Sequence, residues 1–414
     1  MTGDNNMTIQ EGTVAVALQA NFNTALTARE GTGKTTFSQT LVEQALDSEH
    51  QRWRYNSWIL ANLDLIAIGG CPHVVDVEIE GTVVPVVRRT PDEAFVRTAL
   101  ETSIIDVHVF DEFSNATNTK RAGMLDLVTS RRAGGYKLPD DTRFMALLNP
   151  ADCAVVYYDM HPPTTTRWFW LPWEPAVDRS SWRRGMQTGW PAPEPPRLAA
   201  DWEKNLPLAM GLMVAFEKRD PTVFHEGYVL NADGTLSCPN PAKYLNRTRA
   251  NGRTLEMAAK AYAACMSLSN CTEEEAASYR SLLIEGAVGK DAALPFLEFC
   301  ATASVIPAPE ELLDNPDKYP ISEMPPDLQY LAVSSAATHV RSQVVNHRAT
   351  SGDTWAKGLV FFEKVYDSGM GDLATMGASL FLDKTVGVPT GAKIPPNTIA
   401  KLLPMMKDLR TFGA

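Results

Sequence analysis

A glycine-rich run near the start of the chain narrows the range of folds that this sequence can adopt. The run reads GTGKTT at 31–36, after the short apolar stretch TALTA and before the helical pattern TFSQTLVEQAL. A strand, a glycine-rich turn and a helix in this order direct backbone N–H groups toward an anion at the start of the helix. The sequence therefore predicts an α/β domain with a phosphate-binding loop.

This loop supplies each kind of group that a nucleoside triphosphate requires. Its glycines allow close backbone approach, Lys34 adds a cation, and Thr35 offers a hydroxyl to Mg²⁺. Ala28 stands where the pattern GxxxxGK[ST] has its first glycine, and we expect this substitution to be tolerated if its φ is negative. The residues expected to bind the nucleotide in this loop are Glu30, Gly31, Thr32, Gly33, Lys34, Thr35 and Thr36.

An acidic pair follows a second apolar run. The run IIDVHVF at 104–110 is short enough for a buried strand, and Asp111 and Glu112 follow it directly. At the carboxyl end of a parallel strand, Asp111 is expected to hold Mg²⁺ together with Thr35. Glu112 is expected to polarise the attacking water as the catalytic base.

A third apolar run, RFMALLN at 143–149, ends in a polar amide. Asn149 is the last residue of this run and precedes a proline. The amide is expected to hydrogen-bond the γ-phosphate or the water without adding charge, whereas an ordinary Asn-Pro turn is the alternative.

The chain is long enough for two or three domains, and its pattern changes along its length. The alternating run VVDVEIEGTVVPVV predicts an exposed hairpin inserted in the first domain. A proline-rich stretch marks a linker, and helical patterns follow it. The expected segments are an α/β nucleotide-binding core at 1–175, a linker at 176–202, an α-helical lid at 203–301, and a proline-rich connection with a helical region at 302–414.

Charge and hydropathy restrict the environment and the partners. The net charge is −11, which argues against broad binding to nucleic-acid phosphates. The sequence has no apolar run of about 18 residues, and its N-terminus lacks the pattern of an export signal. We therefore expect a cytoplasmic protein that does not enter a membrane.

The order of these motifs resembles the MoxR branch of the AAA+ ATPases, with the strongest similarity to an actinobacterial-type subgroup. The block DEFSNATNTKRAGMLDLVTSRRAGGYKLPDDTRFMALLNP carries the resemblance, together with GGCPHVVD, and it extends over roughly 14–301. It implies an AAA+ P-loop core with a parallel five-stranded sheet, an α-helical lid and a helical C-terminal extension. It also implies ATP and Mg²⁺ as cofactors and hydrolysis of ATP to ADP and phosphate.

The resemblance further implies roles for two arginines. Arg167, in HPPTTTRWFWLPWEP, stands where the family has the arginine finger that reaches the nucleotide of a neighbouring subunit. Arg253, in NGRTLEMAA, stands where the family has its sensor-2 arginine over the nucleotide of the same subunit. Here the sequence departs from the family, because Gly252 replaces the usual proline and Leu255 the usual tryptophan.

An arginine that acts on a neighbour implies an oligomer, by analogy with the family a hexameric ring. The ring is expected to remodel or activate a protein client, with a von Willebrand factor A domain protein as partner. Two other functions stay open: a nucleic-acid motor or loader, and a structural assembly that binds ATP with little turnover.

Overall fold

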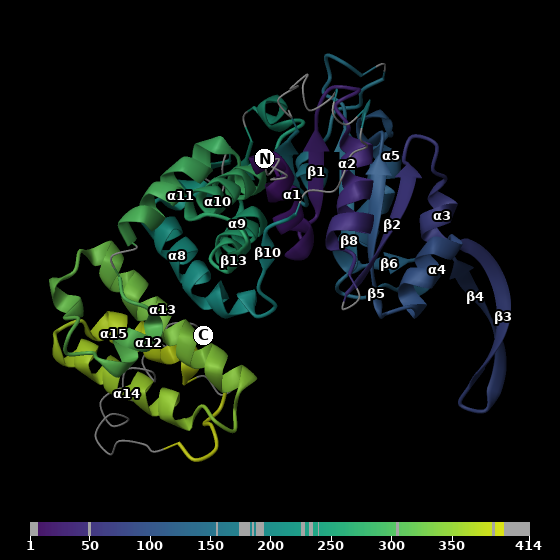
Figure 1. Cartoon of the computed structure of the whole chain (residues 1–414). Coiled ribbons are helices and arrows are strands. Elements are labelled where there is room, and N and C mark those ends of the chain that lie inside the picture. The colour runs from purple at the N-terminus through teal and green to yellow at the C-terminus, as the bar shows by residue number, and fades with distance from the viewer. Residues whose placement is uncertain are drawn as a thin grey trace. The chain divides into compact units, whose positions relative to one another are not determined.

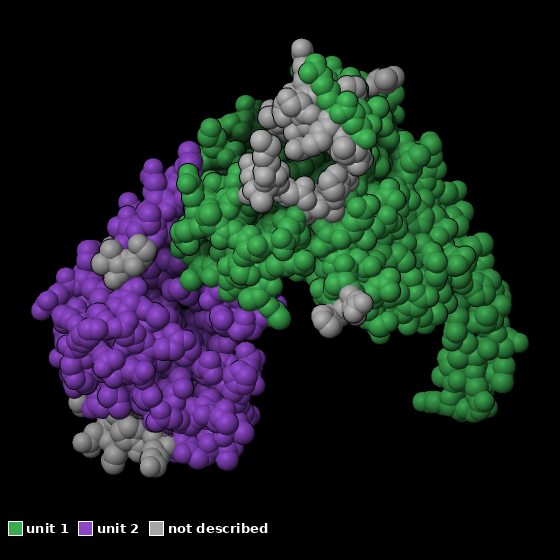
Figure 2. Space-filling view, in the orientation of Figure 1, with its two compact units in different colours: residues 1–200, 225–291 green, residues 201–224, 292–414 purple. Residues whose placement is uncertain are grey.

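A computed structural model describes most of the chain as two compact units. Unit 1 contains 1–200 and 225–291, and unit 2 contains 201–224 and 292–414 (Figure 2). The segment expected at 203–301 is therefore divided between the two units. The described residues are 7–48, 51–154, 156–173, 183, 186–187, 194–224, 228–231, 235–238, 240–303, 306–382 and 386–392.

A five-stranded parallel sheet forms the centre of unit 1 (Figure 1). Its order is β2-β5-β8-β1-β9, so β1 lies between β8 and β9. The predicted α/β class and five-stranded parallel sheet are confirmed, and the three predicted apolar runs form β1, β5 and β8. The bounds are β1 Thr24–Thr27, β2 Arg52–Ile59, β5 Ile104–Asp111, β8 Arg143–Leu148 and β9 Phe169–Pro172.

The sequence of β8 explains its central place in the sheet. All six of its residues are buried, since helices cover both faces of a parallel sheet and leave no solvated side. Around it, Phe110, Phe144, Met124 and Leu127 belong to one apolar cluster. This core holds the carboxyl ends of β5 and β8 in fixed positions.

Helices and short ribbons complete unit 1. The predicted hairpin is confirmed as β3 and β4, which extend away from the sheet in Figure 1, and its turn residues Glu80 and Gly81 have φ of 53° and 80°. The helices are α1 Ile9–Gln19, α2 Lys34–Thr40, the π-helix η1 Leu41–Leu46, α3 Leu65–Gly69, α4 Glu93–Leu100, η2 Phe113–Asn115, α5 Asn118–Ser130, α6 Pro162–Thr165, η5 Pro241–Tyr244, α9 Gly252–Cys265 and α10 Glu273–Val288. The paired short strands are β3 Cys71–Ile79 with β4 Thr82–Thr90, β6 Arg132–Ala133 with β7 Tyr136–Lys137, β10 Arg197–Leu198 with β13 Leu268–Ser269, and β11 Val229–Leu230 with β12 Leu236–Ser237.

Helix α10 packs directly on the edge strand β9. A Cβ atom at Gly286 would lie 2.8 Å from the Trp170 carbonyl oxygen, so only glycine permits this close approach. In the same way, Gly12 of α1 lies against the ring of Tyr279 of α10. These contacts attach α10 to the sheet and to α1 within unit 1.

Unit 2 has a helical core of its own. Trp355, Phe362 and Phe381 are buried in one cluster with Val340 and Leu359. No helix in the described part of the chain is long and apolar enough to cross a membrane. The helical elements assigned to unit 2 or beginning at its boundary are η3 Trp202–Asn205, α8 Leu206–Arg219, η4 Pro221–Phe224, α11 Lys290–Ala303, α12 Pro309–Asp314, η6 Ile321–Glu323, α13 Pro326–Asn346, α14 Gly352–Asp367 and α15 Gly371–Phe381.

Candidate active site

The glycine-rich loop connects β1 to α2 at the carboxyl edge of the sheet. Gly31 and Gly33 have φ of 73° and 81°, values that glycine adopts without strain. A Cβ atom at either residue would meet nothing within 4 Å, so the loop leaves open space. Ala28 is not among the residues with positive φ, and its N–H donates to the Leu148 carbonyl at 3.1 Å. The alanine therefore continues the line of the strand without backbone strain.

Lys34 lies at the centre of the loop. Its Nζ donates to the carbonyl oxygens of Ala28 at 2.7 Å and Arg29 at 3.0 Å, and to Asn149 Oδ1 at 2.9 Å. These three acceptors match the three N–H donors of an ammonium group. Burial lowers the pKa of Lys34, and the carboxylates of Asp111 and Glu112 oppose this shift. The cation is thus held where the loop, β1 and β8 meet.

Thr35 and Asp111 offer a pair of oxygen ligands. Thr35 Oγ1 donates to Asp111 Oδ2 at 2.8 Å, although the two residues are 76 positions apart. One hydroxyl and one carboxylate, with substrate phosphates and water, form a ligand set that suits Mg²⁺. The described residues contain no group of three or more His, Cys, Asp or Glu side chains that could hold a metal.

Glu112 has an unusual backbone conformation. Its φ is 56° and its ψ 35°, in the left-handed region where a glutamate is uncommon. Asn115 Nδ2 donates to Glu112 Oε2, and the Glu112 N–H donates to Asp111 Oδ1 at 2.8 Å. A strained residue held by two such contacts is typical of a functional site, since the surrounding structure must enforce the strain.

Three supporting residues were missed from the sequence. Asn115 holds the Glu112 carboxylate, and Ser114 Oγ accepts from the Asn149 N–H at 3.4 Å. Trp173 is 2% exposed, and its indole N–H donates to the Thr32 carbonyl at 3.1 Å. Ser114 and Asn115 follow closely after the acidic pair in the chain, and this proximity could have identified them. No pattern in the sequence indicated that Trp173 contacts the loop.

The two predicted arginines lie at the other edge of the sheet. The Arg167 carbonyl accepts from Asn23 Nδ2 at 3.3 Å, just before β1 begins, and Arg253 Nη1 donates to Thr166 Oγ1 at 3.4 Å. Because β1 and β9 are parallel, the phosphate loop lies beyond the opposite end of these strands. Their four residues alone span about 10 Å. The role expected for Arg253 over the nucleotide of its own subunit therefore has no supporting contact among the described residues.

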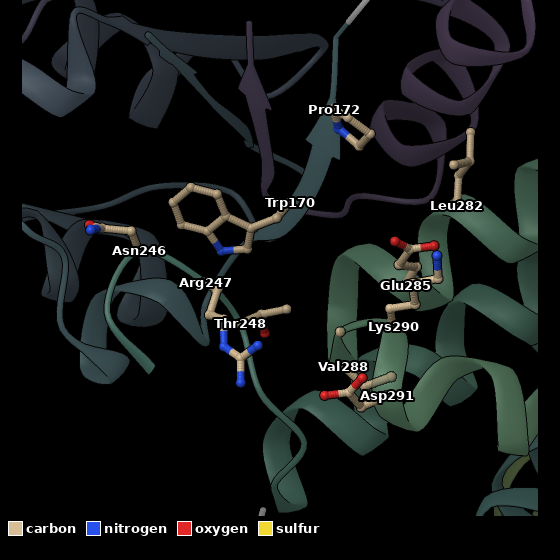
Figure 3. A pocket seen from close by; sticks show the side chains of 11 residues that line it. Trp170, Pro172, Asn246, Arg247, Thr248, Leu282, Glu285, Val288, Lys290 and Asp291 are labelled. Carbon is tan, nitrogen blue, oxygen red and sulfur yellow. The ribbon is translucent and has the colours of Figure 1, made fainter. Parts of the chain in front are cut away.

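A cavity of about 250 Å³ opens beside β9 (Figure 3). Trp170 and Pro172 line it from the strand, and Glu285 and Val288 line it from α10. No residue of the phosphate loop lines it, so it is separate from the site around Lys34. The full lining is Trp170, Pro172, Asn246, Arg247, Thr248, Leu282, Glu285, Val288, Gly289, Lys290 and Asp291.

Comparisons with known proteins add little beyond this geometry. No family model and no curated protein matches the chain. A crystal structure of a proposed ATPase from Cytophaga hutchinsonii is 11% identical, with a TM-score of 0.42, over 69% of this chain and 87% of that protein. NtrX from Brucella abortus is 11% identical, with a TM-score of 0.22, over 89% of this chain and 67% of that protein. Since both TM-scores are below 0.5, the function has to be inferred from the residues of the site.

Proposed function

We propose that this chain is a Mg²⁺-dependent ATPase of the AAA+ type. The observation that carries the proposal is the meeting of Lys34, Thr35, Asp111, Glu112 and Asn149 at one edge of the sheet. These are the groups that bind the phosphates, hold the cation and activate water in phosphoryl transfer. The loop that carries Lys34 and Thr35 is open on the side where its glycines lie.

ATP binding exchanges contacts that already exist within the protein. The Lys34 ammonium would leave one or more of its carbonyl acceptors for phosphate oxygens. Thr35 and Asp111 would hold Mg²⁺, which would supply positive charge to offset the charge that develops on the phosphates. Asn149, released by Lys34, donates its amide N–H to the γ-phosphate or the water.

Glu112 acts on the attacking water. Its carboxylate accepts a proton from the water as the oxygen attacks the γ-phosphorus, and the bond to the leaving ADP breaks. In the structure Oε2 of this carboxylate accepts a hydrogen bond from Asn115, and a carboxylate has further lone pairs that can take the proton. Asn115 therefore orients Glu112 toward the water.

The proposal extends to an assembly, following the resemblance to the MoxR branch. Arg167 would complete the site of a neighbouring copy in a hexameric ring, since its side chain lies away from the phosphate loop of its own chain. The ring would remodel or activate a protein client, with a von Willebrand factor A domain protein as partner. The resemblance supports these last points, while the contacts around Lys34 support ATP hydrolysis itself.

One comparison of variants tests the ATPase proposal. Glu112→Gln should retain ATP and reduce turnover by about 10²-fold or more, because an amide cannot accept the proton. Lys34→Ala should lose ATP binding, measured with a fluorescent ATP analogue. Glu298→Gln, an exposed carboxylate of α11, is the matched control and should behave as the parent. Parent-like turnover by Glu112→Gln would refute the assignment of the base.

A further inference from the structure

One side chain connects the end of β9 to the phosphate loop. Trp173 directly follows β9, and its backbone N–H donates to the Thr27 carbonyl at 2.8 Å, so it continues the pairing of this strand with β1. Because side chains alternate along a strand, Trp173 lies on the same face as Phe169 and Leu171, and all three are buried. Its ring packs against Phe37 of α2, with 4.4 Å between the ring centroids. The indole is therefore held beneath the loop that precedes α2.

The indole N–H of Trp173 binds a backbone carbonyl of this loop. Its Nε1 donates to the Thr32 carbonyl at 3.1 Å, although the two residues are 141 positions apart. A buried indole N–H requires an acceptor, and here the acceptor lies between Gly31 and Gly33, which both have positive φ. Glycines give a loop many alternative conformations. A buried contact between two of them restricts the loop to fewer conformations.

The position of the Thr32 carbonyl determines the direction of the next N–H group. The described part of the chain has no cis peptide bond, so the Thr32 carbonyl and the Gly33 N–H point in opposite directions within one peptide plane. The Gly33 N–H therefore points away from Trp173. It donates to no backbone carbonyl of the described residues, and a Cβ atom at Gly33 would meet nothing within 4 Å. Such an N–H is available to a phosphate oxygen.

We propose that Trp173 is a positioning residue of the phosphate loop: its indole N–H fixes the Thr32 carbonyl so that the Gly33 N–H faces the phosphates of ATP. This inference rests on the proposed function. Because this donor is in place before ATP arrives, binding does not have to order the peptide, and the entropic cost of association is lower. A donor that contacts the phosphate equally in the ground state and the transition state lowers KM without raising kcat.

A second indole on the same strand provides a matched control. Trp170 Nε1 donates to the Thr165 carbonyl at 2.7 Å. This acceptor is the last residue of α6, outside the phosphate loop. Trp170→Phe therefore removes the same kind of hydrogen bond from the same strand, and any general effect of weakening β9 appears in this variant as well.

The first test compares the two phenylalanine variants. Trp173→Phe keeps an aromatic ring near Phe37 but has no N–H to donate. Its affinity for ATP, measured by displacement of a fluorescent ATP analogue, should fall by about tenfold, as on loss of a hydrogen bond to a charged group. Its KM should rise by the same factor while kcat stays within about twofold of the parent, and Trp170→Phe should change neither value. Equal behaviour of the two variants, or a lower kcat with unchanged KM, would overturn the proposal.

The second test uses inorganic triphosphate, which has no base or sugar, to displace the analogue. Trp173→Phe should weaken the binding of triphosphate by the same factor as that of ATP, because the Gly33 N–H acts on the phosphates. An unchanged affinity for triphosphate together with weaker binding of ATP would assign Trp173 to the nucleoside and overturn the proposal.

A replacement of nearly constant volume separates the hydrogen bond from the packing. Replacement of Trp173 by benzothienylalanine puts a sulfur atom in place of the indole N–H and keeps both rings, and urea unfolding checks that the protein is folded. Its affinity for ATP should fall as in Trp173→Phe, whereas parent-like affinity in the folded protein would overturn the inference. Absence of ATP binding and turnover by the parent would instead refute the proposed function, so the two failures are distinguishable.

Discussion

Lys34 Nζ donates to Asn149 Oδ1 at 2.9 Å, a contact that joins two residues 115 positions apart in the chain. It connects the phosphate loop to the end of β8 and places the amide where a γ-phosphate would meet the cation. Together with the carbonyl oxygens of Ala28 and Arg29, this amide gives the Lys34 ammonium three acceptors, which fix the position of its side chain.

Removal of this amide should separate binding from chemistry. Asn149→Ala should keep ATP affinity within a few-fold, because the loop and Lys34 remain, but it should lower turnover by about 10²-fold through loss of one positioned donor. Analogue binding and steady-state turnover measure the two effects. Asn346→Ala, which removes an exposed amide of α13, is the control. Equal losses of binding and turnover would show that Asn149 only shapes the loop.

The alanine at the first position of the loop should not limit affinity. Ala28 lacks a positive φ, so Ala28→Gly relieves no strain and should not tighten ATP binding. It should instead lower the free energy of unfolding by about 1 kcal/mol, through added chain entropy and a lost buried methyl group. Urea unfolding and analogue binding check this, and tighter binding by the glycine variant would contradict it.

The Mg²⁺ concentration required for turnover should depend on Asp111. Asp111→Asn keeps an oxygen for Thr35 Oγ1 but loses the charge that attracts the cation. We expect the Mg²⁺ concentration at half-maximal turnover to rise by about tenfold, near 1.4 kcal/mol, while binding of the analogue changes little. Asp126→Asn, an exposed carboxylate of α5, should leave the Mg²⁺ titration unchanged. EDTA should stop turnover by the parent.

His108 should make unit 1 sensitive to acid. Burial lowers the pKa of His108 to about 4, and its Nδ1 accepts from the indole N–H of Trp58 at 3.1 Å, so the proton lies on Nε2 toward Thr98. The unfolded chain takes up a proton near pH 6.5, whereas the folded chain does so only near 4, and stability therefore falls as pH decreases between these values. Each unit of pH between 6.5 and 5 should cost about 1.4 kcal/mol.

Replacement of His108 by glutamine isolates the contribution of its protonation to stability. The amide of His108→Gln can accept a hydrogen bond from Trp58 and donate one to Thr98, but it does not titrate. Urea unfolding at pH 7 and at pH 5 should therefore show a loss about 2 kcal/mol larger for the parent than for the variant. Parallel pH profiles for the two proteins would contradict the assigned protonation state.

The sequence alone determined the loop, the acidic pair and the strands that present them. GTGKTT, Asp111 and Asn149 are local signals, because each follows a short apolar run whose length and composition favour a buried strand. The hairpin at 71–90 was predictable for the same reason, from strict alternation around Glu80 and Gly81. Local periodicity and turn chemistry require no knowledge of distant residues.

The tertiary structure decided which distant groups meet. The order of the sheet brings Thr35 to Asp111 and Lys34 to Asn149, and packing alone places Trp173 on the Thr32 carbonyl. The same packing brings Arg253 to Thr166, the residue directly before Arg167. Such contacts depend on strand order and on how helices pack against the edge strand, and neither leaves a periodic pattern in the chain.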